Sequence, residues 1–110
     1  MTTLMARFEA ASKAYAESNG IHRDRDWFIL KLQEEMGEVT QAWNRLSGRG
    51  RRRDRSEAEL QQDLADEAAD MLGHVLLLAH HHNLDLASAI QRKWRFDPLS
   101  ADDRAQGGST

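Results

Sequence analysis

Apolar residues recur every three or four positions along most of the chain, and this spacing predicts α-helices. The first helix follows Thr2 or Thr3, either of which can cap it, and ends at the stop signal Ser18-Asn19-Gly20. A second helix is expected from Asp26, as its N-cap, to about Leu46. The apolar positions are Leu4, Phe8, Ala11 and Tyr15 in the first helix and Phe28, Leu32, Met36, Val39, Trp43 and Leu46 in the second.

The longest apolar pattern predicts a third helix from about Glu57 to His82, with Ser56 and Glu59 as a capping box. Its main apolar face consists of Leu60, Leu64, Ala68, Met71, Leu72, Val75, Leu78 and Ala79. A second face carries mostly small residues, namely Ala65, Ala69, Gly73 and Leu76. Because a helix that is apolar on two sides is central, we expect another helix to approach these small residues closely.

Two segments lack this periodicity. Gly48 to Arg55 holds five arginines, which predicts an exposed loop. Its residues 49–55 could bind nucleic acid or polyphosphate, although such a loop is more often only solvated. Residues 100–110 are polar and rich in glycine and serine, so we expect a disordered tail. A single helical domain is therefore predicted over residues 1–99.

A short fourth helix is predicted from Leu86 to about Phe96, where Asp97-Pro98 ends it. It would bury Leu86, Ile90 and Trp94. Sparse aromatic residues and a single proline favour helices over a β-sandwich or barrel. The fold class is therefore predicted to be all-α, with a four-helix bundle as the architecture.

Composition narrows the possible functions. The chain lacks cysteine, which excludes disulfides, thiolate metal sites and cysteine nucleophiles. Its net charge of −3 provides no basic field for stable nucleic-acid binding. The longest apolar run, Val75 to Ala79, is too short for a membrane span, and the start has no signal pattern. A soluble cytoplasmic protein is the expectation.

Acidic residues border the apolar stripes of the two long helices. Glu35 and Glu38 are three positions apart, as are Glu67 and Asp70, so each pair stacks on one helix face. Unpaired carboxylates beside a core repel one another, and a cation among them would relieve the cost. Oxygen ligands favour Mg²⁺, Mn²⁺ or Ca²⁺. The alternative is pairing with arginine or lysine, for which Lys31 lies on the same strip.

Several histidines invite other interpretations. A di-iron carboxylate bundle would need Glu-x-x-His motifs, which both acidic pairs lack, although His74 could act as a late ligand or lie at the core edge. His80-His81-His82 could bind a metal, but at a helix C-terminus these side chains more often complement the helix dipole.

Trp27 could stack on a base or pack against a partner helix or subunit.

The acidic motifs resemble those of the MazG-type all-α nucleoside triphosphate pyrophosphohydrolases. Leu-Gln-Glu-Glu-Met-Gly-Glu-Val, at residues 32–39, is similar to the first motif helix of that family. Asp-Glu-Ala-Ala-Asp, at residues 66–70, resembles the second, and the helix that carries Lys93 resembles the one that follows. The resemblance covers roughly Asp26 to Arg95, and the segment from His22 to Trp27 is similar to the dCTP-hydrolysing branch.

The resemblance implies a homodimer or homotetramer that hydrolyses a (deoxy)nucleoside triphosphate to the monophosphate and pyrophosphate. Such an enzyme would remove non-standard or surplus nucleotides, dCTP-like ones among them. The implied catalytic residues are Glu34, Glu35 and Glu38. The implied ligands of Mg²⁺, for which Mn²⁺ could substitute, are Glu35, Glu38, Glu67 and Asp70. The implied substrate-binding residues are His22, Trp27, Lys31, Lys93 and Arg95. The alternatives are a phosphoribosyl-ATP pyrophosphohydrolase and a non-catalytic helical oligomer that binds a nucleotide or a partner.

Overall fold

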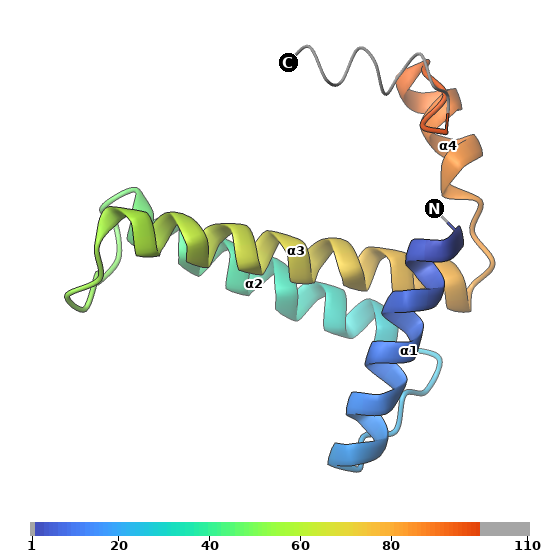
Figure 1. Cartoon of the computed structure of the whole chain (residues 1–110), viewed down its shortest axis with the longest axis horizontal. Helices are drawn as coiled ribbons and strands as arrows, with labels where there is room; N and C mark the ends of the chain where they lie inside the picture. The colour runs from blue at the N-terminus through green and yellow to red at the C-terminus, as the bar shows by residue number, and fades with distance from the viewer. Residues whose placement is uncertain (1, 100–110) are drawn as a thin grey trace.

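The computed structural model describes residues 2–99, which form helices without any strand (Figure 1). The helices are α1 (Thr2–Asn19), α2 (Trp27–Leu46), α3 (Glu57–His81) and α4 (Leu86–Trp94). The predicted all-α class is confirmed, and the helix ends lie within about two residues of those expected. The predicted tail of residues 100–110 lies outside the described residues, and the assignment of residues 1–99 to one domain stays a prediction.

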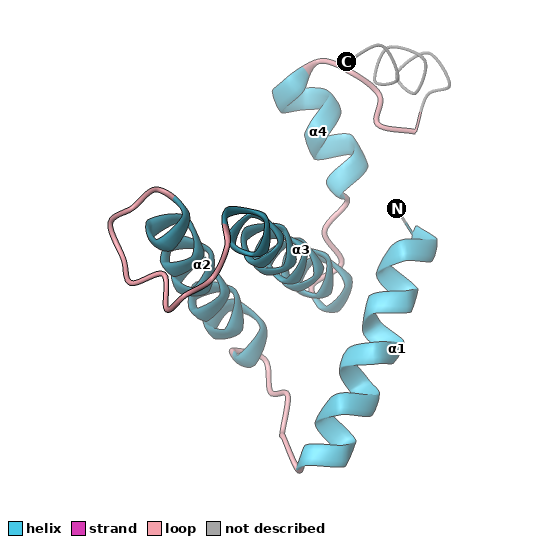
Figure 2. Cartoon of the chain, turned by 60° about the vertical axis from the view of Figure 1, so that its left-hand side comes forward, coloured by secondary structure: helices cyan, strands magenta, loops and turns pink. Residues whose placement is uncertain are grey.

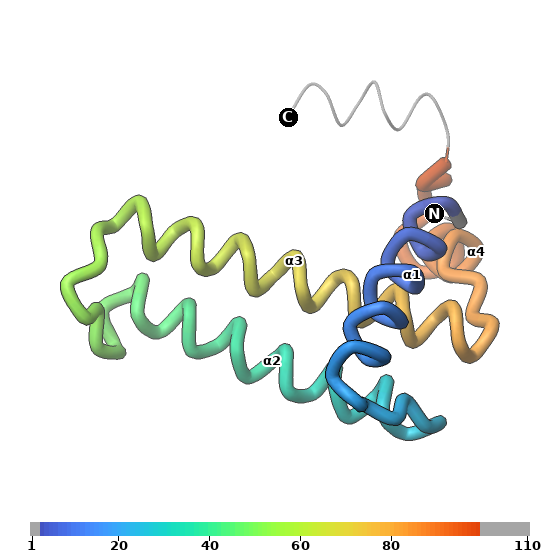
Figure 3. Tube along the Cα trace, turned by 60° about the horizontal axis from the view of Figure 1, so that its bottom comes forward, coloured from blue at the N-terminus to red at the C-terminus, as the bar shows by residue number. Residues whose placement is uncertain are grey.

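The two long helices, α2 and α3, run antiparallel side by side, and α1 crosses them near one end (Figures 1 and 3). The buried residues of α2 are Phe28, Glu35 and Ala42, which are spaced by seven positions and form one line toward α3. Leu60 is buried at one end of α3, and Leu76 and Leu77 are buried toward the other. The core is therefore a seam between two helices, and one of its members is an acid.

The apolar stripe predicted for α2 does not face α3 along its centre line. Met36 and Trp43 are 50% and 48% exposed, and Leu72 of α3 is 52% exposed. The helices meet instead along the line through Ala42, whose small side chain permits close approach. An apolar strip beside the seam is consequently left uncovered by the described residues.

The close approach expected at the small residues of α3 is confirmed at Gly73. A Cβ atom at this position would lie 2.7 Å from Cε1 of Phe8, so the ring of Phe8 occupies the space that a side chain would need. Ala65 and Ala69, on the same face, are exposed. Contact with α1 is thus limited to one end of α3, since α1 crosses rather than follows it.

The expectation that α4 is buried is wrong. This helix projects away from the end of α3 and makes no extended contact with the other described helices (Figure 2). Trp94 is 74% exposed, and Leu86 and Ile90 are only half-buried. The helix ends at Trp94 because Arg95 adopts a left-handed conformation with φ of 65°. Within one chain, three helices pack and the fourth stands apart.

The helices α2 and α3 begin at the predicted positions, but the N-terminus of α2 is capped by a different residue from the one expected. Ser56 and Glu59 form the expected capping box, with N–H to side-chain oxygen distances of 3.1 and 2.9 Å. Asp26 occupies the N-cap position of α2 but makes no side-chain cap bond. Oδ1 of Asp24 instead accepts the N–H groups of Asp26 and Trp27, at 3.1 and 2.9 Å. The carboxylate two residues earlier therefore fixes the entry into α2.

The arginine-rich loop is exposed, as expected, and is tied to the start of α3. Nη1 of Arg52 lies 2.8 Å from Oε2 of Glu57, and Nη2 of Arg55 lies 2.6 Å from Oδ1 of Asp63. Such exposed pairs contribute little to stability. They connect the loop to the first turns of α3, whereas the predicted acidic pairs lie further along α2 and α3.

Candidate metal and nucleotide site

Three of the predicted acidic residues converge across the α2–α3 seam. Oxygen atoms of Glu35, Glu67 and Asp70 all lie within 4.8 Å of one another, and we call these residues the acidic triad. Glu35 is buried, Glu67 is half-buried and Asp70 is exposed. The triad therefore runs from the protein interior to the surface, where a ligand could reach it.

The carboxylates of the triad are poorly compensated. Burial raises the pKa of Glu35, and repulsion by Asp70 raises it further. Burial also raises the pKa of Glu67, with Glu38 as the next cause. Within residues 2–99, no lysine or arginine forms an ion pair with a triad member, and Lys31 pairs with Glu34 at 3.7 Å. Within the described residues, the carboxylates of the triad are therefore not paired with arginine or lysine, which was the alternative to a bound cation.

The donor set fits a hard divalent cation. Carboxylate oxygens are the ligands that Mg²⁺ and Mn²⁺ prefer, and a cation among them would offset the repulsion that raises these pKa values. Glu38, which is exposed, lies outside the triad but is close enough to affect Glu35 and Glu67 electrostatically. Glu34 is exposed as well and faces Lys31. These two acids could complete a metal site or act on a water molecule beside it.

A cavity of about 460 Å³ borders the triad at Glu35 and Asp70. Lys31 and His74 line its polar part, next to these carboxylates. Its apolar wall includes the aromatic rings of Phe8, Tyr15 and Trp27. One cavity is thus lined by acidic residues as well as by aromatic rings, so it offers separate surfaces for a cation with its phosphates and for a base.

His74 occupies the boundary between the two ends. Its Nε2 lies 3.7 Å from Oε1 of Glu35, and its ring centroid lies 6.1 Å from that of Trp27. Burial lowers the pKa of His74, and the charge of Lys31 acts in the same direction. Its Nδ1 is buried without a hydrogen-bond partner. A neutral imidazole at the core edge is therefore the form that the surroundings favour.

Of the five predicted substrate-binding residues, only two line the cavity within a single chain. His22 is exposed in the α1–α2 connection and does not line the cavity, whereas Trp27 and Lys31 do. Lys93 and Arg95 belong to α4 and its end, which stand apart from the triad (Figure 1). Their proposed contact with substrate would require a second chain or a movement of α4.

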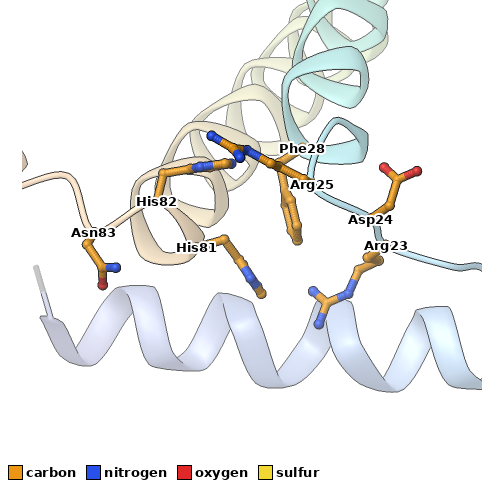
Figure 4. Close-up of a pocket in the computed structure, with 7 residues that line it drawn as sticks. All are labelled: Arg23, Asp24, Arg25, Phe28, His81, His82 and Asn83. Atoms are coloured by element: carbon orange, nitrogen blue, oxygen red, sulfur yellow. The ribbon is translucent and has the colours of Figure 1, made fainter.

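A second group of polar residues was not foreseen from the sequence. Arg23 and His81 both contact Glu9 of α1, at 2.9 and 2.8 Å. They lie beside a separate cavity of about 450 Å³ in which Arg23 and His81 point toward α1 on either side of Phe28 (Figure 4). His81 thus binds a carboxylate of another helix as well as lying in the last turn of α3. No periodic spacing links these positions, so only the fold could reveal their contact.

A comparison with protein families identifies the class to which this all-α fold and its acidic triad belong. The family model described as phosphoribosyl-ATP pyrophosphohydrolase matches residues 3–92, so the chain belongs to this family. The family lies within the MazG-like all-α superfamily that the motifs indicated, and its members are hydrolases acting on phosphoric anhydrides. The similarity to the dCTP-hydrolysing branch stays a prediction. No curated protein and no solved structure gives a significant match.

None of the helices described between residues 2 and 99 is long and apolar enough to cross a membrane. The expected cytoplasmic location and the absence of stable nucleic-acid binding stay predictions.

Proposed function

We propose that the chain hydrolyses a (deoxy)nucleoside triphosphate to the monophosphate and pyrophosphate, with the phosphates at the acidic triad and the base in the adjoining cavity. The observation that carries this proposal is the shared border between the triad and the aromatic cavity at Glu35 and Asp70. Removal of non-standard or surplus nucleotides would be its cellular role.

Glu35, Glu67 and Asp70, joined by Glu38, would hold Mg²⁺, and Mn²⁺ would substitute. Such an ion, when bound, would neutralise part of the negative charge of the triphosphate and lower the pKa of a bound water. Glu34 lies on the exposed side of α2, where its carboxylate can orient the attacking water or accept its proton. Lys31, which is close to Glu34, would then neutralise a phosphate oxygen.

Trp27 would provide the stacking surface for the base. Its ring is partly exposed and lines the cavity, and it packs edge to face with the buried ring of Phe28, with ring centroids 5.1 Å apart. A ring held by a buried neighbour loses little conformational freedom when a base binds. His22 would contact the base only if the connection before α2 moved, because it does not line the cavity in this structure.

The second candidate substrate is phosphoribosyl-ATP, which the description of the matching family favours. Both candidates share the phosphoanhydride and differ at the base, where phosphoribosyl-ATP carries an additional sugar phosphate. Such a base needs an open cavity rather than a closed one. The cavity reaches the exposed side of Tyr15, which is 64% exposed, so an enlarged base would have a route to solvent.

We further propose that the active form is a homodimer or homotetramer in which a second chain completes the site. Met36, Trp43 and Leu72 form an exposed apolar strip beside the α2–α3 seam, which a second copy could cover. Trp94 is exposed on α4, next to Lys93. An α4 helix that docks on a partner would bury this tryptophan and carry Lys93 or Arg95 toward the partner's triad.

The test is release of pyrophosphate and monophosphate from a panel of nucleoside and deoxynucleoside triphosphates, some with modified bases, and from phosphoribosyl-ATP. Each is measured with Mg²⁺ and again with EDTA. Glu38→Ala should abolish turnover and preserve the fold, whereas Glu57→Ala, at the far end of α3, should leave turnover unchanged. Wild-type activity in Glu38→Ala would contradict the assignment of the metal site. If phosphoribosyl-ATP alone is hydrolysed, the second candidate replaces the first.

A further inference from the structure

We propose that Glu9, Arg23 and His81 form a clamp that holds α1 against the cavity and thereby sets the affinity for substrate. The inference rests on the proposed function, because the cavity is taken to bind the base. None of the three residues touches the acidic triad, and none is assigned to the chemistry. They are positioning residues, and their effect would pass through α1.

The clamp joins segments that are distant in the sequence. Arg23 binds Glu9 through two parallel bonds, Nη1 to Oε1 at 2.9 Å and Nη2 to Oε2 at 3.0 Å. His81, from the last turn of α3, lies 2.8 Å from the same Oε1 atom. The Arg23 side chain is only 11% exposed, and that of Glu9 20%. A bidentate pair with this degree of burial is geometrically specific and stronger than a surface ion pair.

The clamp also touches the wall of the proposed base cavity directly. Nη1 of Arg23 donates a second bond, of 3.0 Å, to Oγ of Ser12. Ser12 lines the cavity together with Phe8 and Tyr15, all of them from α1. The same guanidinium therefore binds the carboxylate that anchors α1 and the hydroxyl of a residue that lines the cavity.

A second connection runs through Phe28 to the opposite wall of the cavity. His81 stacks on Phe28 with ring centroids 4.0 Å apart, and the guanidinium of Arg23 lies 5.4 Å from the centroid of the same ring. Phe28 in turn contacts Trp27 edge to face. Figure 4 shows Arg23 and His81 on either side of Phe28. Through Ser12 on α1 and through Phe28 and Trp27 on α2, the clamp would support both walls of the base cavity.

Without the clamp, α1 would be held by its packing on α3, which includes the contact of Phe8 with Gly73. Because α1 crosses α3 instead of following it, this contact does not fix the angle of the helix. A looser α1 would leave the triad in place, since Glu35, Glu67 and Asp70 belong to α2 and α3. Loss of the clamp should therefore lower the affinity for substrate without altering the chemical step.

The experiment compares the wild-type chain with Glu9→Gln, which keeps the size of the side chain but removes its charge. Steady-state kinetics use the nucleotide that the wild type hydrolyses fastest, and hydrogen exchange follows the backbone amides of α1. We expect KM to rise on the order of tenfold, kcat to change less than about twofold, and exchange in α1 to become faster. Arg23→Lys, which retains the charge but not the two-bond fork, should give a smaller rise in KM.

Glu57→Gln is the matched control, because it also removes one carboxylate that pairs with an arginine, at 2.8 Å, but at the far end of α3. It should leave KM and the exchange of α1 unchanged. An unchanged KM in Glu9→Gln, or a fall in kcat as large as the rise in KM, would overturn the clamp as a positioning device. Unchanged exchange in α1 would overturn it as well. A wild-type chain that hydrolyses no nucleotide would refute the proposed function, while the exchange measurement would still decide whether the clamp holds α1.

Discussion

Oε1 of Glu35 lies 3.7 Å from Nε2 of His74 across the buried seam between α2 and α3. The seam position of Glu35 is one that a leucine would fill in an ordinary helix pair, since Phe28 and Ala42 precede and follow it at intervals of seven residues. A carboxylate there carries a desolvation cost that its neighbours do not offset. This placement explains why one substitution should have opposite effects on stability and activity.

We expect Glu35→Gln to stabilise the metal-free protein and to weaken Mg²⁺ binding, which would remove its activity. The raised pKa of Glu35 means that ionisation opposes folding, so the gain should be present near neutral pH and disappear as pH falls below the ordinary range of glutamate. A gain of about 1 kcal/mol would raise Tm by several degrees. Thermal unfolding in EDTA and Mg²⁺ binding by calorimetry test both halves. A lower Tm, or undiminished Mg²⁺ binding, would contradict the prediction.

Trp27→Ala should raise KM on the order of tenfold and lower kcat by less than about threefold, because stacking holds the base in substrate and transition state alike. Trp27→Phe should retain part of the affinity, since a smaller aromatic face remains. Steady-state kinetics on the preferred nucleotide measure both values. A KM that stays at the wild-type level in Trp27→Ala would rule out base stacking at this ring.

Gly73→Ala should destabilise the fold by about 1–3 kcal/mol, because the new Cβ would lie 2.7 Å from the ring of Phe8. Gly37 provides the opposite case on α2, where a Cβ would meet nothing within 4 Å. Gly37→Ala should therefore stabilise the protein by about 0.5–1 kcal/mol through the helix preference of alanine. Urea unfolding of the two variants is the measurement, and equal effects of the same sign would refute the close packing of α1.

The Glu9 clamp should make stability depend on acid pH. The bonds from Arg23 hold the pKa of Glu9 at about 2, below its ordinary value of 4.5. The stabilisation is therefore fully present above about pH 4.5 and is lost as pH falls toward about 2. The free energy of unfolding should fall more steeply over this range in the wild type than in Glu9→Gln. Parallel curves for the two proteins would show that Glu9 titrates normally.

A mixture of two inactive variants should recover activity if α4 completes the site of a partner chain. Glu38→Ala alters the acidic residues, and Lys93→Ala alters α4. In a dimer with shared sites, an equal mixture should regain about a quarter of the wild-type rate, because half of the molecules are mixed and each of these has one intact site. Recovery would be absent if each site lay within one chain. Full activity of Lys93→Ala alone would remove this lysine from the site.

The sequence determined the helices and much of the acidic set, because both depend on contacts within a few residues. Helical spacing, the Ser56 capping box and the small side chain of Gly73 are local features that the fold retains. The paired spacing of Glu67 and Asp70 likewise placed both carboxylates on one face of α3. Only the direction of each helix face and its immediate neighbours can be deduced in this way.

The tertiary structure decided everything that depends on how the helices meet. The rotation of α2 about its axis determines which side faces α3, and it places Glu35 in the seam and leaves Met36 exposed. Apolar spacing alone does not determine this rotation. The crossing of α1 brought Glu9 to Arg23 and His81, although His81 is 72 positions away along the chain. The projection of α4 separated Lys93 from the triad. These outcomes follow from long-range packing, in which side-chain volume and burial, rather than local pattern, determine the contacts.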